Sequence, residues 1–114
     1  QGYDAKNRSM HTDENVSMGA ALAKMAKASE DTNAEGRMLQ KLQAFATSLD
    51  MKEASHHLKN MIQLLGSKGI AVNYVLLSAD LYEFQFPEAR NHVNLRWGQD
   101  FYREMYRKET KEEL

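Results

Sequence analysis

The segment from Arg90 to Arg107 constrains the fold more than any other part of the chain, because it reads as a helix with two different faces. At about 100° per residue, one continuous stripe collects large apolar side chains four residues apart: Val93, Trp97, Phe101 and Met105. The only tryptophan of the chain lies within this stripe, where burial of its large surface should anchor the packing. A separate arc of about 80° gathers polar and cationic side chains: His92, Arg96, Gln99, Arg103 and Arg107. The segment therefore predicts a helix with a core face and a cationic face.

Apolar periodicity predicts four further helices upstream of this segment. The spacing places them at residues 16–28, 33–48, 51–65 and 73–84, and the last helix then runs from Pro87 to Lys108. Each start carries a capping signal: Asn15 or Ser17, a Thr32–Glu35 capping box, Asp50, Asn73, and Pro87 in a first turn. With 114 residues, 42% hydrophobic content and one proline, the chain predicts an all-α fold, a single bundle of about five helices with short loops.

The predicted fourth helix differs from the others because apolar side chains wrap most of its circumference: Tyr74, Val75, Leu77, Leu81, Tyr82 and Phe84. A helix that is apolar all round is usually buried, so we expect this one to be central. Outside the bundle domain at residues 15–108, we expect a flexible polar segment at 1–14 and a charged tail at 109–114.

The chain carries no pattern that supports catalysis, a metal site or a cofactor. His56 and His57 are adjacent on a helix, so they point about 100° apart and cannot share an ion as an i, i+4 pair could. Carboxylates are scattered singly, and no phosphate-binding glycine loop or nucleophile motif is present. The absence of cysteine excludes disulfides and thiolate ligands and fits a reducing, cytoplasmic location. No apolar run approaches the roughly 18 residues that a membrane span needs.

Charge placement is the remaining functional signal. The net charge of −1 argues against an autonomous, strongly basic nucleic-acid binder, but five lysines or arginines lie between Arg90 and Lys108 against two acidic residues. A second polar stripe follows the third helix at Lys52, His56, Lys59 and Gln63. Long cationic side chains at repeated spacing can follow a phosphate backbone, although many such helix faces are merely solvated. The candidate nucleic-acid-binding residues are Lys52, His56, Lys59, Arg90, His92, Arg96, Arg103 and Arg107.

Two nearby tyrosines could add to such a surface. Tyr102 and Tyr106 lie on the last helix and could stack on exposed bases, but the pattern favours their burial.

Four segments together resemble CasB, the small subunit of the type I-E CRISPR surveillance complex Cascade. The segment 16–22 resembles the family's Ser-Leu-Gly-Arg-Ala-Leu opening, and 57–65 resembles its leucine-rich helix. Residues 70–77 resemble the start of its next helix, and 93–102 are similar to the closing Arg-Trp-x-x-x-Phe-Tyr. Two positions depart from the family: Asn73 replaces a commoner acidic cap, and Ala20 stands where arginine is frequent.

The resemblance implies a non-catalytic, all-helical subunit that stabilises the R-loop between guide RNA and target DNA. Its implied partners are other Cascade subunits, a second copy of itself, CRISPR RNA, and target or displaced DNA, with no membrane contact. Family members usually carry a further helical region before the Ser-x-Gly motif, so we expect this chain to be a fragment. The contacts carried over by position are Lys52, Lys59, Arg90, His92 and Arg96, while Arg103 and Arg107 rest on helical phase alone.

The alternative function belongs to a different class of protein. A helical interaction module could use the same cationic faces to bind acidic protein partners. Binding to heparin resin or to random-sequence DNA at low salt separates the two, because a phosphate-binding protein should bind both.

Overall fold

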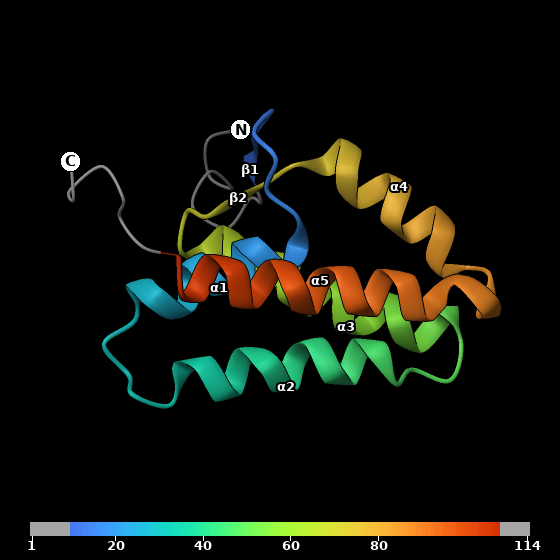
Figure 1. Ribbon diagram of the computed structural model, residues 1–114, viewed down its shortest axis with the longest axis horizontal. Helices are drawn as coiled ribbons and strands as arrows, with labels where there is room; N and C mark the ends of the chain where they lie inside the picture. The colour runs from blue at the N-terminus through green and yellow to red at the C-terminus, as the bar shows by residue number, and fades with distance from the viewer. Residues whose placement is uncertain (1–9, 108–114) are drawn as a thin grey trace.

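A computed structural model of the chain describes residues 10–107 and has five α-helices in that range. The elements in chain order are β1 (Met10–His11), α1 (Met18–Ala28), α2 (Ala34–Ala46), α3 (Met51–Ser67), β2 (Ala71–Val72), α4 (Tyr74–Phe84), the short 3-10 helix η2 (Pro87–Ala89) and α5 (Arg90–Met105). Figure 1 shows α2, α3 and α5 with roughly parallel axes, α2 running opposite to the other two, with α1 behind α5 and α4 at the edge. The predicted all-α bundle is confirmed.

Most helix starts use the predicted caps. The side chains of Ser17, Asp50 and Asn73 accept hydrogen bonds from backbone N–H groups in the first turns of α1, α3 and α4. The expected capping box at Thr32 is wrong, because α2 begins after Asn33 without a side-chain cap. Instead, the Asp31 carboxylate accepts a hydrogen bond of 2.8 Å from the Asn33 backbone N–H.

The core is centred on the crossing of α1 and α5. Gly19 of α1 lies against the Trp97 backbone, and a Cβ at this glycine would collide with the Trp97 carbonyl oxygen. The Trp97 ring is buried and stacks on the Phe45 ring, with centroids 5.0 Å apart. The centroids of the Phe45 and Phe84 rings are 4.4 Å apart. The predicted apolar stripe of the last helix is therefore the centre of the packing.

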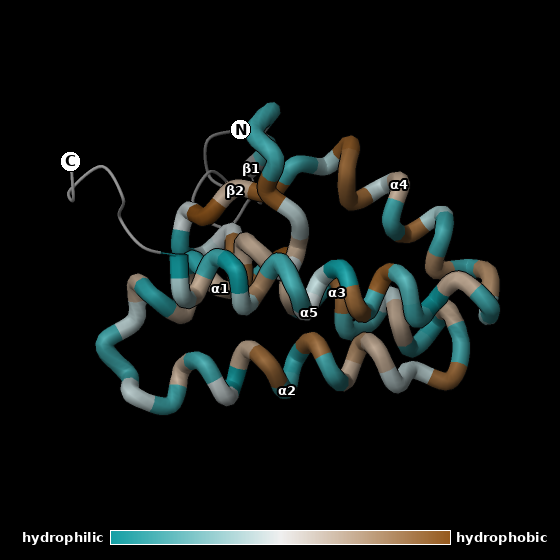
Figure 2. The backbone as a smooth tube through the Cα atoms, viewed as in Figure 1, coloured by the Kyte–Doolittle hydropathy of each residue, from teal (hydrophilic) through white to brown (hydrophobic). Residues whose placement is uncertain are grey.

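The expected central position of α4 is wrong. The helix contacts α5 and η2 at the edge of the bundle, and the exposed fractions of Val75 and Tyr82 are 70% and 65%. Its only buried residues are Leu77, Asp80 and Phe84, so it packs through one narrow face. Apolar residues recur along α4 (Figure 2), but other helices cover only one side of it.

Residues 10–11 form an element that the sequence did not predict. Met10 and His11 pair in parallel with Ala71 and Val72 as β1 and β2. A two-residue strand has no periodicity, and its partner lies some sixty residues away, so only the folded chain reveals it. The last helix also differs slightly from the prediction, because η2 precedes it and α5 ends at Met105. Residues 1–9 of the expected flexible segment and the charged tail at 109–114 lie outside the described residues.

Candidate nucleic-acid interface

The cations in the first half of α5 bind α4. Arg96 donates to the buried carboxylate of Asp80 at 2.5 Å and to Glu83 at 3.1 Å. The same Asp80 accepts the Trp97 indole N–H at 2.7 Å, so one carboxylate joins two neighbouring α5 side chains to α4. Burial lowers the pKa of Arg96, but the hydrogen bonds to Asp80 and Glu83 outweigh it and raise that pKa above its ordinary value. Arg96 therefore links α5 to α4.

Arg90 and His92 lie in the same region. The Arg90 Nε donates to the Phe84 carbonyl oxygen at 2.9 Å, and its guanidinium stands 4.8 Å above the Phe84 ring. The His92 ring nitrogen lies 3.7 Å from Glu83. Both candidate residues thus have partners within the protein, which reduces what they can offer to a phosphate.

The second half of α5 meets α1 in a group that we call the α1–α5 cluster: Lys24, Lys27, Arg103 and Arg107 around Asp100 and Glu104. Glu104 is buried and accepts from Lys27 at 2.8 Å and from Arg107 at 3.3 Å. Asp100 accepts from Arg103 at 2.8 Å. Four cations share two carboxylates, so the cluster keeps an excess of positive charge.

Sequence reasoning assigned no role to Lys24 and Lys27. The signal was present, because they lie one turn and about two turns after Ala20 on the exposed side of α1. Ala20 is where the resembled family often has arginine. Lys24 can therefore supply a cation on the same face of α1.

Glu104 responds to these charges. Burial raises the pKa of its carboxyl, but the hydrogen bond from Lys27 and the charges of Lys24, Lys27 and Arg107 hold that pKa below its ordinary value. The Glu104 carboxylate is thus ionised at neutral pH and anchors the cluster.

The motif residues of the resemblance meet at the same crossing. Ser17 donates to Asp100 at 2.7 Å while it caps α1, and Gly19 lies against the Trp97 backbone. These segments are far apart in the sequence, yet they fix how α1 lies on α5. The motif positions at this crossing therefore position the cationic cluster.

The predicted cationic stripe on α3 is solvated. Lys52, His56 and Lys59 are exposed, and none of the three forms an ion pair within residues 10–107. His56 contacts only Asn60, one turn along the same helix, at 3.5 Å. We call Lys52, His56 and Lys59 the α3 stripe.

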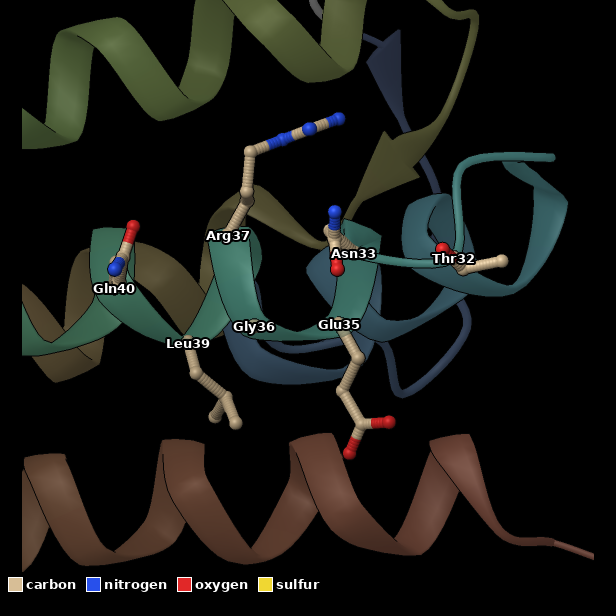
Figure 3. Close-up of a pocket in the computed structure, with 7 residues that line it drawn as sticks. All are labelled: Thr32, Asn33, Glu35, Gly36, Arg37, Leu39 and Gln40. Carbon is tan, nitrogen blue, oxygen red and sulfur yellow. The ribbon is translucent and has the colours of Figure 1, made fainter.

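Two lysines that the prediction omitted lie near the α2–α3 side of the bundle. Lys41 and Lys68 line a cavity of about 830 Å³ whose apolar lining includes Met25, Met38 and Leu64. Neither lysine forms an ion pair within the part of the chain that the structure describes. Figure 3 shows the neighbouring Arg37 on the side of α2 opposite to Glu35 and Leu39, and Arg37 binds Asp31.

The eight candidate residues therefore do not form one continuous cationic face. Arg90, His92 and Arg96 bind within the α4–α5 contact, Arg103 and Arg107 join the α1–α5 cluster, and the α3 stripe stands separately. Within residues 10–107, no group of three potential ligand side chains could hold a metal ion. None of the described helices has the length and apolarity needed to cross a bilayer.

Both the sequence and the fold resemble those of known CRISPR-associated proteins. A sequence model of the family "CRISPR-associated protein Cse2" matches residues 1–102. The crystal structure of CasB from Thermobifida fusca matches the fold with a TM-score of 0.70 at 24% sequence identity. This match covers 82% of the present chain and 50% of CasB, so the chain spans about half the length of that relative. No curated protein matches the chain.

Proposed function

The chain belongs to the CRISPR-associated protein Cse2 family, and on that premise we propose that it acts as a non-catalytic subunit of the CRISPR surveillance complex Cascade. Its role in this proposal is to bind nucleic-acid backbone without sequence preference and to stabilise the R-loop between guide RNA and target DNA. Sequence recognition then belongs to base pairing with the guide. The proposed partners are other Cascade subunits, a second copy of the chain, CRISPR RNA and target or displaced DNA, in the cytoplasm.

The observation that carries this proposal is the α3 stripe. Lys52 and Lys59 are solvated and form no ion pair within residues 10–107, so they are free to neutralise phosphates and release counterions, which is the main source of non-specific affinity. The α1–α5 cluster supports the same role through its excess of positive charge. A near-neutral protein can still bind in this way when other subunits provide most of the charged surface.

The internal bonds rank the candidate residues. Lys52 and Lys59 come first, because neither forms an ion pair within residues 10–107. Arg103 and Arg107 follow, because the cluster that contains them has four cations for two carboxylates. Arg96 comes last, since it already has two carboxylate partners.

Salt-dependent binding of random-sequence DNA tests the proposal. The double variant Lys52→Ala/Lys59→Ala should bind more weakly, and its slope of log affinity against log salt should fall by about two, because two phosphate contacts are lost. The matched control Lys52→Arg/Lys59→Arg keeps both charges and should retain the slope. An unchanged slope in the alanine variant, with intact folding, would contradict the role of the α3 stripe.

One observation also favours contact with other proteins. The exposed residues of α4 are uncharged and include Val75 and Tyr82, and the exposed Phe86 follows α4, its ring edge to face with that of Tyr82 at a centroid distance of 5.4 Å. Such uncharged, aromatic surface is typical of protein interfaces. This second function is compatible with a subunit of an assembly, and substituting Tyr82 by Glu should impair assembly without changing DNA binding by the isolated chain.

A further inference from the structure

We propose that a groove between α2 and α5 takes an unpaired nucleobase of single-stranded nucleic acid, an inference that rests on the proposed function and names its substrate more closely. The α2–α5 groove has a volume of about 320 Å³ and is lined by Leu39, Leu42, Gln43, Ala46, Asn94, Trp97, Gly98 and Tyr102.

The groove has the chemistry of a base pocket. None of its lining residues is charged, and leucine, alanine and the tyrosine ring supply apolar walls for a flat heterocycle. Gln43 and Asn94 bring one carboxamide from each helix, and a carboxamide offers both a donor and an acceptor to a base edge. Gly98 keeps the α5 side open, because nothing lies within 4 Å of the position that a Cβ would occupy.

Two exposed tyrosines extend this wall. The exposed fractions of Tyr102 and Tyr106 are 47% and 61%, and their rings are nearly parallel, 10° apart, with centroids at 6.1 Å. The Tyr106 hydroxyl donates to Glu35 of α2 at 2.6 Å, which fixes that ring before any ligand arrives. Figure 3 shows Glu35 and Leu39 projecting from α2 toward α5, on the side of the groove. A base could therefore stack on an ordered aromatic surface.

Two arginines, one on α5 and one just after it, lie near the groove, and the Glu35 carboxylate there is bonded to the Tyr106 hydroxyl. Arg103 follows Tyr102 directly in the sequence. Its side chain is therefore rotated by about 100° around the α5 axis from that of Tyr102, at nearly the same position along the axis. Arg103 and Arg107 are exposed, while the groove itself is uncharged. A base in the groove would place its own phosphate toward this cationic side.

The carboxamides favour a base over an apolar protein side chain. An apolar occupant would cover Gln43 and Asn94 without satisfying them, and each unpaired polar group costs about 1–3 kcal/mol. A nucleobase edge can bond to both.

Titration of the full chain with oligothymidylate and with an abasic strand of equal length tests the inference. Both strands carry the same backbone charge, and only the first carries bases. Trp97, the sole tryptophan of the chain, lines the groove and reports occupancy through its fluorescence. We expect oligothymidylate to change this emission and to bind about 5- to 160-fold more tightly than the abasic strand, the range for one stacked base.

Variants localise the effect. Gly98→Leu should fill the groove and Tyr102→Ala should remove the stacking wall, so either should abolish the preference for the base-bearing strand. Tyr102→Phe should retain it. Gly36→Leu is the matched control for Gly98→Leu, since its Cβ also meets open space but lies outside the groove. Thermal melting should show that each variant is folded.

The outcomes separate the two proposals. Equal affinity for both strands would overturn the base pocket and leave backbone binding intact. Failure of both strands to bind at low salt would overturn both proposals. Unchanged strand binding by Gly98→Leu, together with loss of assembly into Cascade, would assign the groove to a protein partner and overturn the base pocket.

Discussion

The α3 and α5 helices carry cationic side chains at the same helical spacing, yet the structure uses them differently. On α5, Arg96 is held by Asp80 and Glu83, and Arg107 by Glu104. On α3, Lys52 and Lys59 meet no carboxylate within residues 10–107. The reason is position: the α5 arc lies between α1 and α4, whereas the α3 stripe faces outward. Spacing along a helix therefore indicates which cations share a face, and the neighbouring helix decides whether they are available.

The largest effect should come from Asp80→Ala, which breaks the α5 side of this comparison. The Trp97 indole N–H would lose its partner in a buried site, and Arg96 would lose its closest carboxylate. Because Arg96 is partly solvated, we expect a loss of about 2–4 kcal/mol in the free energy of unfolding. Urea denaturation measures this loss. A variant as stable as the parent would show that Asp80 does not stabilise the contact between α4 and α5.

Acid titration sharpens the same comparison at the other end of α5. The pKa of Glu104 in the folded protein lies below its ordinary value of 4.5, so its stabilising effect is complete above that pH and is lost as the pH falls through the lower folded value. Glu104→Gln should reduce stability at pH 7 by about 1–2 kcal/mol and flatten the acid limb of the stability curve. Thermal melting across pH tests this, and an acid limb as steep as that of the parent would contradict it.

The smallest effect on stability should come from the α3 stripe. Lys52→Ala/Lys59→Ala removes two solvated side chains without acidic partners, so the free energy of unfolding should change by no more than about 0.5 kcal/mol. Denaturation of this variant beside Asp80→Ala completes the comparison. A loss as large as that of Asp80→Ala would mean that these lysines have structural partners.

Several features were predictable from local pattern. The stripe that contains Trp97 identified the centre of the core, because a helix with one apolar face has to bury it. The caps at Ser17, Asp50 and Asn73 were also visible, since capping is an interaction within one turn.

Other features depend on contacts between distant segments. The departure at Asn73 is one example, because its carboxamide caps α4 and also donates to the Glu14 carbonyl oxygen at 2.9 Å, which an aspartate could not do. The edge position of α4 is another, since an apolar circumference does not state which side finds a partner.

By itself, the sequence determined the five helices, the buried face of α5 and the family, because periodicity, capping and motif order are properties of contiguous residues. Only the tertiary structure decided that Arg96 belongs to the fold, that Lys24 and Lys27 join Arg103 and Arg107, and that an uncharged groove lies beside two ordered tyrosines. The physical reason is that the availability of a charge or a ring depends on what packs against it, and those neighbours come from elements far away in the chain.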